Sequence, residues 1–159
     1  FNNDVKSIYE CVPVGEVKEL NDENYHPNCS TALYDAMGMS RNALRPKVAE
    51  DDKVVVTVVT DGYENASKEY TGKAVKALID ELKAKGWVFA YIGANQDVEA
   101  VAATISITNV MMFEATSSGT AEMSKKLGNA RSRLFDRMSC SSYSAEEANK
   151  DFFDEDEKH

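Results

Sequence analysis

The amino-acid sequence predicts an α/β fold, a doubly wound and mostly parallel sheet flanked by helices. Two apolar runs carry this prediction, Lys53–Thr60 and Trp87–Ile92. The first is continuously β-branched after its lysine, and both resemble strands that are buried on two faces instead of one. Longer segments with helical periodicity follow each run. Strands that alternate with helices imply right-handed crossovers and therefore parallel strands.

The first third of the chain predicts one strand and one helix. Residues 5–12 alternate loosely between apolar and polar, which favours an edge strand from Val5 to Val12 that ends before Pro13. From Ser30 onward, apolar residues recur with a helical period and predict a helix that runs to about Val48.

The remaining elements follow in the order that the fold class requires. We expect helices at Thr71–Lys85, closed by Gly86, and at Asp97–Ala103. A third strand is expected at Val110–Phe113. The last predicted helix starts at a cap, Ser117 or Ser118, and runs to about Met138. Residues 141–159 are serine-rich and then acidic, which predicts a disordered tail after a domain of residues 1–140.

Charge narrows the classes of function. The 159 residues suit one domain and carry 27 acidic and 18 basic side chains, a net charge of −9. The last sixteen residues hold seven of those acids and two lysines, so the rest of the chain is only mildly acidic. Such a chain presents no basic surface for nucleic acid or an anionic membrane, so neither is an expected partner.

The cysteine and histidine content excludes further kinds of site. The three cysteines, Cys11, Cys29 and Cys140, are odd in number and have no paired spacing, which excludes a complete intramolecular disulfide framework. This usage favours reduced thiols and a cytoplasmic location. His26 and His159 have no cysteine or histidine neighbour at zinc-site spacing, so a zinc site is not expected.

Thr31 and Asp61 are the candidate metal ligands. Asp61 directly follows the Lys53–Thr60 strand, and ligands of parallel sheets collect at the carboxyl ends of strands. Thr31 lies at the start of the predicted Ser30–Val48 helix. A carboxylate and a hydroxyl are hard oxygen ligands that suit Mg²⁺. The structural alternatives are a helix N-cap at Ser30 or Thr31 and a simple turn at Asp61 and Gly62.

Two segments resemble the von Willebrand factor A (integrin I-like) family. The segment Pro27–Ala36, followed after one helix by Val58–Asn65, looks like the second and third motifs of that family in order and spacing. The resemblance extends from residue 1 to about residue 138. It implies a Rossmann-like sheet and a metal-ion-dependent adhesion site holding Mg²⁺ or Mn²⁺. Thr31 and Asp61 are the matching ligand positions, and Ser30, Glu64 and Asn65 would form the rim.

The resemblance also implies that part of the family's domain is absent. The family's first motif, Asp-x-Ser-x-Ser, has no match in residues 1–14, so its first strand and helix and most of its second strand have no counterpart. The Lys53–Thr60 strand would then have an unpaired edge, with its peptide groups unsatisfied. Either another polypeptide segment completes the sheet, or the sequence is an incomplete record of the folded unit. Without the first motif, the metal would be held weakly or lost.

The leading hypothesis is a binding module and not an enzyme. A protein partner would supply a carboxylate to the open position of the Mg²⁺ or Mn²⁺ ion, as the resemblance implies. One alternative is a magnesium-dependent hydrolase or phosphotransferase using Asp61, although no nucleophile, general base or phosphate-binding lysine is evident beside it. The other is a structural or interaction domain that binds partners without metal.

Overall fold

The computed structural model describes residues 1–26, 30–94 and 97–154. They form two compact units that interleave along the chain. Unit 1 contains Phe1–Asp52 and Tyr63–Val75, and unit 2 contains Lys53–Gly62 and Lys76–His159. Two units thus occupy the stretch that the sequence assigns to one domain.

Unit 2 is built on a three-stranded parallel sheet, which confirms the α/β class. Its strands are β1 (Val55–Thr60), β2 (Val88–Gly93) and β3 (Asn109–Met112), in the spatial order β1-β2-β3. Both pairings are parallel, with β1 and β2 in register along their full lengths. All six residues of β2 are buried, as expected for a central strand with two neighbours.

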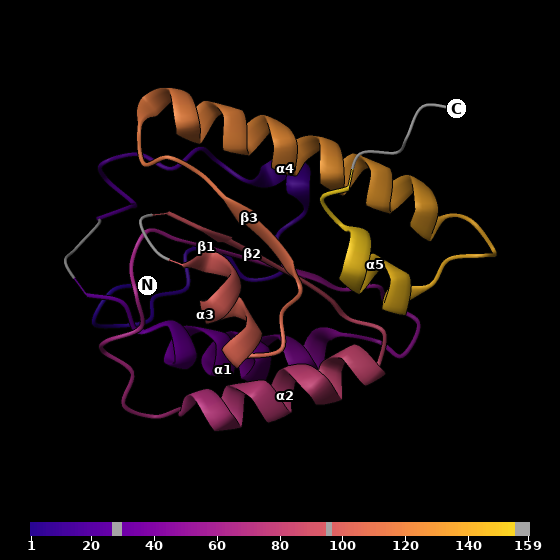
Figure 1. Cartoon of the computed structure of the whole chain (residues 1–159), viewed down its shortest axis with the longest axis horizontal. Helices are drawn as coiled ribbons and strands as arrows, with labels where there is room; N and C mark the ends of the chain where they lie inside the picture. Colours follow the sequence, from indigo (N-terminus) through magenta and orange to yellow (C-terminus); the bar gives the residue numbers. More distant parts are fainter. Residues whose placement is uncertain (27–29, 95–96, 155–159) are drawn as a thin grey trace. The chain divides into compact units, whose positions relative to one another are not determined.

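Helices cover both faces of this sheet. Figure 1 shows α4 (Ser117–Met138) and α5 (Ala145–Asp151) on one side of the strands and α3 (Val98–Thr104) on the other. The predicted α3 and α4 are therefore confirmed. The cap of α4 is Thr116, one residue before the serines that the sequence suggested, because its hydroxyl accepts from Gly119 N at 3.0 Å.

The core of unit 2 lies between β2 and the two helices α4 and α5. Val88 and Ala90, which share one face of β2, pack in one cluster with side chains of both helices. The cluster's other buried members are Ala130, Leu134, Met138, Ala148 and Phe152. The α4 residues are spaced by four, so they form one inward stripe along this helix.

The helix α2 (Gly72–Ala84) was also predicted. The buried side chains are Val75, Ile79 and Leu82, whereas Ala74 is exposed and Leu78 is half-buried. The buried stripe of this helix therefore runs through Val75, Ile79 and Leu82. Gly86 follows with φ of 85°, the left-handed conformation in which glycine commonly ends a helix.

The C-terminal segment differs from the disordered tail that the sequence predicts. Residues 145–151 form α5, and Ala148, Asn149 and Phe152 are buried. Residues 155–159 of the predicted tail lie outside the described residues. The helix begins at Ser144, whose hydroxyl accepts from Glu147 N at 3.3 Å. Composition suggested disorder because acidic side chains dominate the segment, but its few apolar residues all face the sheet.

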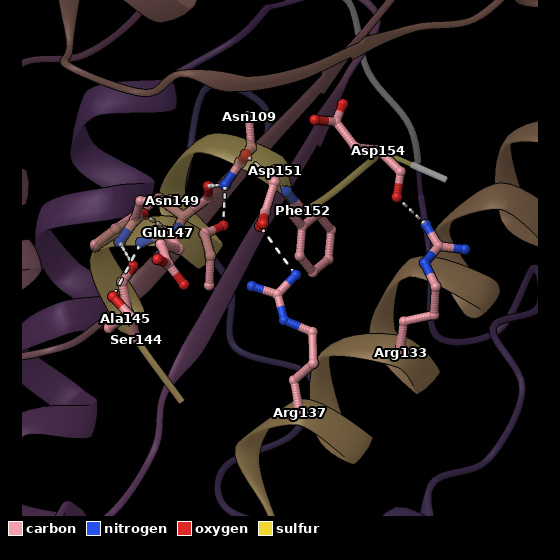
Figure 2. Close-up of polar contacts among 12 residues, drawn as sticks. Asn109, Arg133, Arg137, Ser144, Ala145, Glu147, Asn149, Asp151, Phe152 and Asp154 are labelled. Atoms are coloured by element: carbon pink, nitrogen blue, oxygen red, sulfur yellow. Dashed lines mark hydrogen bonds and ion pairs between the residues drawn. The ribbon is translucent and has the colours of Figure 1, made fainter. Parts of the chain in front are cut away.

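Two buried asparagines attach α5 to the sheet (Figure 2). The Asn149 side chain accepts from Phe89 N at 3.0 Å and donates to the Trp87 carbonyl at 2.8 Å. Asn109 donates to the carbonyls of Phe89 and Ala148, at 3.0 and 2.8 Å, and accepts from Phe152 N at 3.1 Å. β3 pairs with β2 only from Ala90 onward. The Asn149 amide therefore serves the β2 peptide groups that lie before the start of β3.

Arginines of α4 contact the same segment from the other side. Arg137 forms an ion pair with Asp151 at 3.0 Å, and Arg133 donates to the Asp154 carbonyl at 3.0 Å (Figure 2). The Arg137 and Asp151 side chains are about one third exposed, so this pair contributes modestly to stability. The buried asparagines hold the helix more strongly, because they satisfy peptide groups that water cannot reach.

Unit 1 contains one long helix and little other regular structure. The helix α1 (Leu33–Leu44) confirms the prediction but starts later, and it passes into the short 3-10 helix η2 (Arg45–Lys47) at Pro46. The 3-10 helix η1 (Val14–Glu16) lies nearer the amino terminus. The expected edge strand Val5–Val12 is wrong, since these residues are not paired with any described strand. Loose alternation is insufficient where no neighbouring ladder is present.

The strand β1 lies at an edge of the sheet, although its composition predicts burial on both faces. Val58 and Thr60 are buried, whereas the Val59 side chain is 42% exposed. A β-branched run thus identified the strand without distinguishing an edge position from a central one. The Lys53 ammonium, just before β1, lies 5.1 Å from the Tyr143 ring centroid and donates to the Met138 carbonyl.

We expect Asn149→Ala to destabilise the chain by about 2–4 kcal/mol, because it leaves the buried Phe89 N–H and Trp87 carbonyl without partners. Denaturant unfolding monitored by circular dichroism measures this loss. The control is Lys150→Ala, which removes an exposed neighbour that forms an ion pair with Glu146 on the same helix, and which should change stability by about 0.5 kcal/mol or less. Equal unfolding midpoints for the two variants would contradict the assigned role of Asn149.

Candidate functional site

Thr31 lies in the loop before α1, and its backbone is held on both sides by Asn65. The Thr31 N–H donates to Asn65 Oδ1 at 2.9 Å. The Thr31 carbonyl accepts from Asn65 N at 3.0 Å and from Ala66 N at 3.3 Å. Within the described part of the chain, the Thr31 hydroxyl makes no hydrogen bond. The residue is therefore fixed in position while its side-chain oxygen stays uncommitted.

Glu64 and Ser67 cap the amino terminus of α1 from a distant part of the sequence. Ala32 precedes the helix and has no side chain that can cap it. Glu64 accepts from Tyr34 N at 2.9 Å, and the Ser67 hydroxyl accepts from Asp35 N at 3.1 Å. Glu64 also accepts from Ala66 N, Ser67 N and the Ser67 hydroxyl, at 2.7–2.9 Å. Two N–H groups of the first helical turn thereby find acceptors.

Asp35 makes the reciprocal connection from α1 to the loop. Its carboxylate is 7% exposed and accepts from Lys68 N at 2.7 Å, Glu69 N at 2.9 Å and Tyr70 N at 2.8 Å. The helix thus caps the loop while the loop caps the helix. We call this arrangement, formed by Asp35, Glu64 and Ser67 with their backbone donors, the reciprocal clamp.

The clamp shifts the acidity of both carboxyl groups. Burial raises the pKa of Asp35, but the backbone N–H groups of residues 68–70 favour the carboxylate and hold that pKa below its usual value. Burial likewise raises the pKa of Glu64. The hydroxyl and N–H of Ser67, with the N–H groups of Tyr34 and Ala66, outweigh it and lower the pKa overall. Both side chains are therefore anionic at neutral pH.

Two glycines allow the helix and the loop of unit 1 to approach closely. A Cβ atom on Gly38 would lie 2.5 Å from the Tyr70 ring, and one on Gly72 would lie 3.0 Å from the Tyr34 hydroxyl. The Tyr70 hydroxyl accepts from the Asn42 side chain at 2.7 Å, which fixes the ring against α1. Close aromatic contact therefore supplements the hydrogen bonds of the reciprocal clamp.

Asp61 belongs to unit 2 and follows the last residue of β1. Its side chain is exposed. The turn is organised by Thr60, whose hydroxyl lies 3.3 Å from Gly62 N and 3.2 Å from the Gly62 carbonyl. The Thr60 carbonyl accepts from Ala94 N at 3.1 Å, which extends the β1–β2 ladder to this point. Asp61 thus sits at the carboxyl edge of the sheet, where the sequence placed it.

The structure brings together one subset of the predicted site residues. Thr31 and Asn65 are hydrogen-bonded, and Glu64 lies on the same loop as Asn65, with Ser30 directly before Thr31. Both Glu64 oxygens are engaged in the reciprocal clamp, a role that the sequence analysis did not assign. The pairing of Thr31 with Asp61 joins residues of different units and stays a prediction. Pro27, Asn28 and Cys29 of the first quoted motif lie outside the described residues.

Sequence reasoning missed Asp35 and Ser67 as organising residues. Asp35 is part of the quoted motif, but an acid in the first turn of a helix is usually explained by the helix dipole alone. The residues that donate hydrogen bonds to its carboxylate lie 33 to 35 positions further along the chain. The available signal was a buried acidic position on the apolar face of a predicted helix, directly before Ala36.

The uncommitted oxygens suit a hard cation. The Thr31 hydroxyl and the Asp61 carboxylate are ligand types that Mg²⁺ accepts, and two protein ligands would leave most of its positions to water. Within residues 1–26, 30–94 and 97–154, no three or more histidine, cysteine, aspartate or glutamate side chains cluster as metal ligands.

Comparisons with known proteins leave the family open. No protein-family description, curated protein or solved structure matches this chain. No helix in the described ranges is long and apolar enough to cross a membrane.

The reciprocal clamp should make stability depend on acid pH. Both carboxyl groups have folded-state pKa values below their ordinary values of 3.8 for Asp35 and 4.5 for Glu64, so the unfolded state binds protons more readily. Their stabilisation is present above those ordinary values and is lost as pH falls through the folded-state values. We expect the melting temperature of Asp35→Asn and Glu64→Gln to fall less steeply with acid than that of the wild type.

A thermal unfolding series across the acid range measures these slopes. Glu69→Gln is the matched control, because this exposed carboxylate of the same loop makes no hydrogen bond with the described residues. Its slope should equal that of the wild type. If all four proteins lose stability in parallel, the clamp carboxylates do not govern the acid response.

Proposed function

We propose that this chain is a metal-ion-dependent protein-binding module of the von Willebrand factor A type. Mg²⁺ or Mn²⁺ would be held by the Thr31 hydroxyl and the Asp61 carboxylate, with Ser30, Glu64 and Asn65 around them. The bound ion would offer an open coordination position to an acidic side chain of a protein partner. The pairing of the two ligands comes from the order and spacing of the motifs.

The observation that supports the proposal most directly is the state of Thr31. Its backbone N–H and carbonyl are both hydrogen-bonded to the 65–66 segment, at 2.9–3.3 Å, while its hydroxyl makes no hydrogen bond with a described residue. A threonine that served only as a helix cap would use its hydroxyl on the first turn. Here Glu64 and Ser67 perform that capping, which leaves the Thr31 oxygen available for a ligand.

The other side chains would have supporting roles. Asn65 positions Thr31, and Glu64 fixes the first turn of α1, so neither needs to touch the ion. The Asp61 carboxylate is exposed and carries the negative charge that attracts a cation. An ion held by few protein oxygens keeps bound water that a partner's carboxylate can displace. Affinity for the partner would therefore depend on the ion.

We expect Mn²⁺ to bind the purified chain weakly, and Asp61→Asn to weaken that binding about tenfold or more, equivalent to about 1.4 kcal/mol. Thr31→Val should also weaken it, whereas Thr31→Ser keeps a hydroxyl and should restore binding. Titration followed by the electron paramagnetic resonance signal of free Mn²⁺ measures the affinity.

Asp136→Asn is the control for a general loss of negative charge, because Asp136 is exposed on α4 and outside both motifs. It should leave the affinity unchanged. Wild-type affinity in both Asp61→Asn and Thr31→Val would rule out this pair of ligands.

A further inference from the structure

A pocket of about 570 Å³ lies within unit 2, between the end of α2, the start of β3 and α5. Its lining includes Lys83 and Gly86 around the end of α2, Thr108 just before β3, and Ala145 and Lys150 of α5. Every lining residue belongs to unit 2. The volume falls within the range of about 300–1,000 Å³ that is usual for small-molecule sites. We call it the Lys83 pocket.

One side of the Lys83 pocket is apolar and built from very small residues. Ala84 and Ala145 contribute methyl groups, and Gly86 contributes bare backbone. A Cβ atom added to Gly86 would lie 3.9 Å from the Ala145 Cβ, which is an ordinary van der Waals contact. This side of the pocket therefore offers apolar surface to the body of a ligand.

The Lys83 ammonium brings a positive charge that is only partly compensated. The side chain is half-buried and forms no ion pair with a described residue. Asp80 attracts it, but the Asp80 carboxylate already pairs with Lys76 at 2.8 Å. Burial lowers the pKa of Lys83 more than the charge of Asp80 raises it. A partly desolvated charge of this kind is unfavourable until an opposite charge comes beside it.

Ser106 holds this ammonium group in place. Its carbonyl accepts from Lys83 Nζ at 2.5 Å. Ser106 has φ of 60°, a left-handed conformation that is uncommon for residues other than glycine and that is often found at functional sites. A lysine that is already held loses less side-chain freedom when a ligand binds. The Lys83 ammonium is therefore preorganised for an anion.

A second lysine makes the lining positive in an otherwise acidic chain. Lys150 pairs with Glu146 of the same helix at 2.8 Å, and its side chain is 66% exposed. Lys83, Lys150 and Glu146 are the charged residues of the lining, so its net charge is +1. The whole chain carries −9. The Lys83 pocket is therefore complementary to a single negative charge.

We propose that the Lys83 pocket binds a small organic carboxylate, with its charged group beside Lys83 and its apolar body against Ala84 and Ala145. One carboxylate supplies the single charge that Lys83 lacks. A phosphate dianion would bring more charge than this lysine compensates, and Glu146 would repel it. The lining also contains no arginine, whose planar group is suited to phosphate.

Amide NMR titration of the whole chain with benzoate tests this site. We expect saturable shifts at Gly86, Thr108, Ala145 and Lys150, with a dissociation constant in the millimolar range or below. Benzamide has nearly the same shape without the charge, so it should bind about tenfold or more weakly, which corresponds to about 1.4 kcal/mol. Inorganic phosphate at the same ionic strength should also bind more weakly than benzoate.

Two substitutions at Lys83 separate its charge from its hydrogen bond. Lys83→Gln keeps a donor for the Ser106 carbonyl and removes the charge, so it should weaken benzoate binding about tenfold or more. Lys83→Arg keeps the charge and should retain binding. Lys85→Gln is the matched control, because it removes a lysine that pairs with Glu81 and lies outside the pocket lining. It should leave the affinity for benzoate unchanged.

Four outcomes overturn the inference. They are equal affinities for benzoate and benzamide, tighter binding of phosphate than of benzoate, unchanged benzoate affinity in Lys83→Gln, and shifts that avoid the residues of the pocket. Thr31 and Asp61 do not line the pocket, and no metal is added. The result is therefore independent of the proposed adhesion site.

Discussion

Hydrogen bonding of buried peptide groups is the constraint on which both units depend. In unit 2 the central strand β2 is completely buried, so none of its N–H or carbonyl groups can rely on water. β1 provides hydrogen-bond partners for the peptide groups on one side of β2, and β3 provides them for most of those on the other side. Where β3 has not yet begun, the side chain of Asn149 completes the ladder. The position of α5 follows from this requirement, because Asn149 can reach β2 only when the helix lies against the sheet.

Peptide groups in need of hydrogen-bond partners also organise unit 1. Here the partners are side-chain carboxylates, whereas in unit 2 the partner is a side-chain amide. The first turn of α1 has no local cap, and the loop of residues 64–70 has backbone N–H groups without regular structure to accept them. Glu64 and Asp35 each satisfy donors of the other segment. Because remote residues cap the helix, the Thr31 hydroxyl has no hydrogen bond with any of the residues that the structure describes. Structural bonding and the candidate ligand are thus two consequences of one arrangement.

Local periodicity was sufficient to predict most of the regular elements. The strands β1, β2 and β3 and the helices α1, α2, α3 and α4 were all expected, because runs of apolar residues and helical stripes are properties of neighbouring residues. The edge strand at Val5–Val12 failed for the reason that a strand also needs a neighbour. The C-terminal segment was misjudged because composition averages over its residues. The buried ones, Ala148 and Asn149 of α5 and Phe152 after it, are few among exposed acidic residues.

The sequence by itself determined the α/β class, the order of its elements and the candidate oxygens of Thr31 and Asp61. Only the tertiary structure decided that Glu64 is a capping residue and that α5 is part of the core. The physical reason is the distance along the chain between interacting groups. Asn149 lies 60 residues from Phe89, and Tyr34 lies 30 residues from Glu64. Such partners leave no local pattern, because each is chosen by the unsatisfied groups that folding brings beside it.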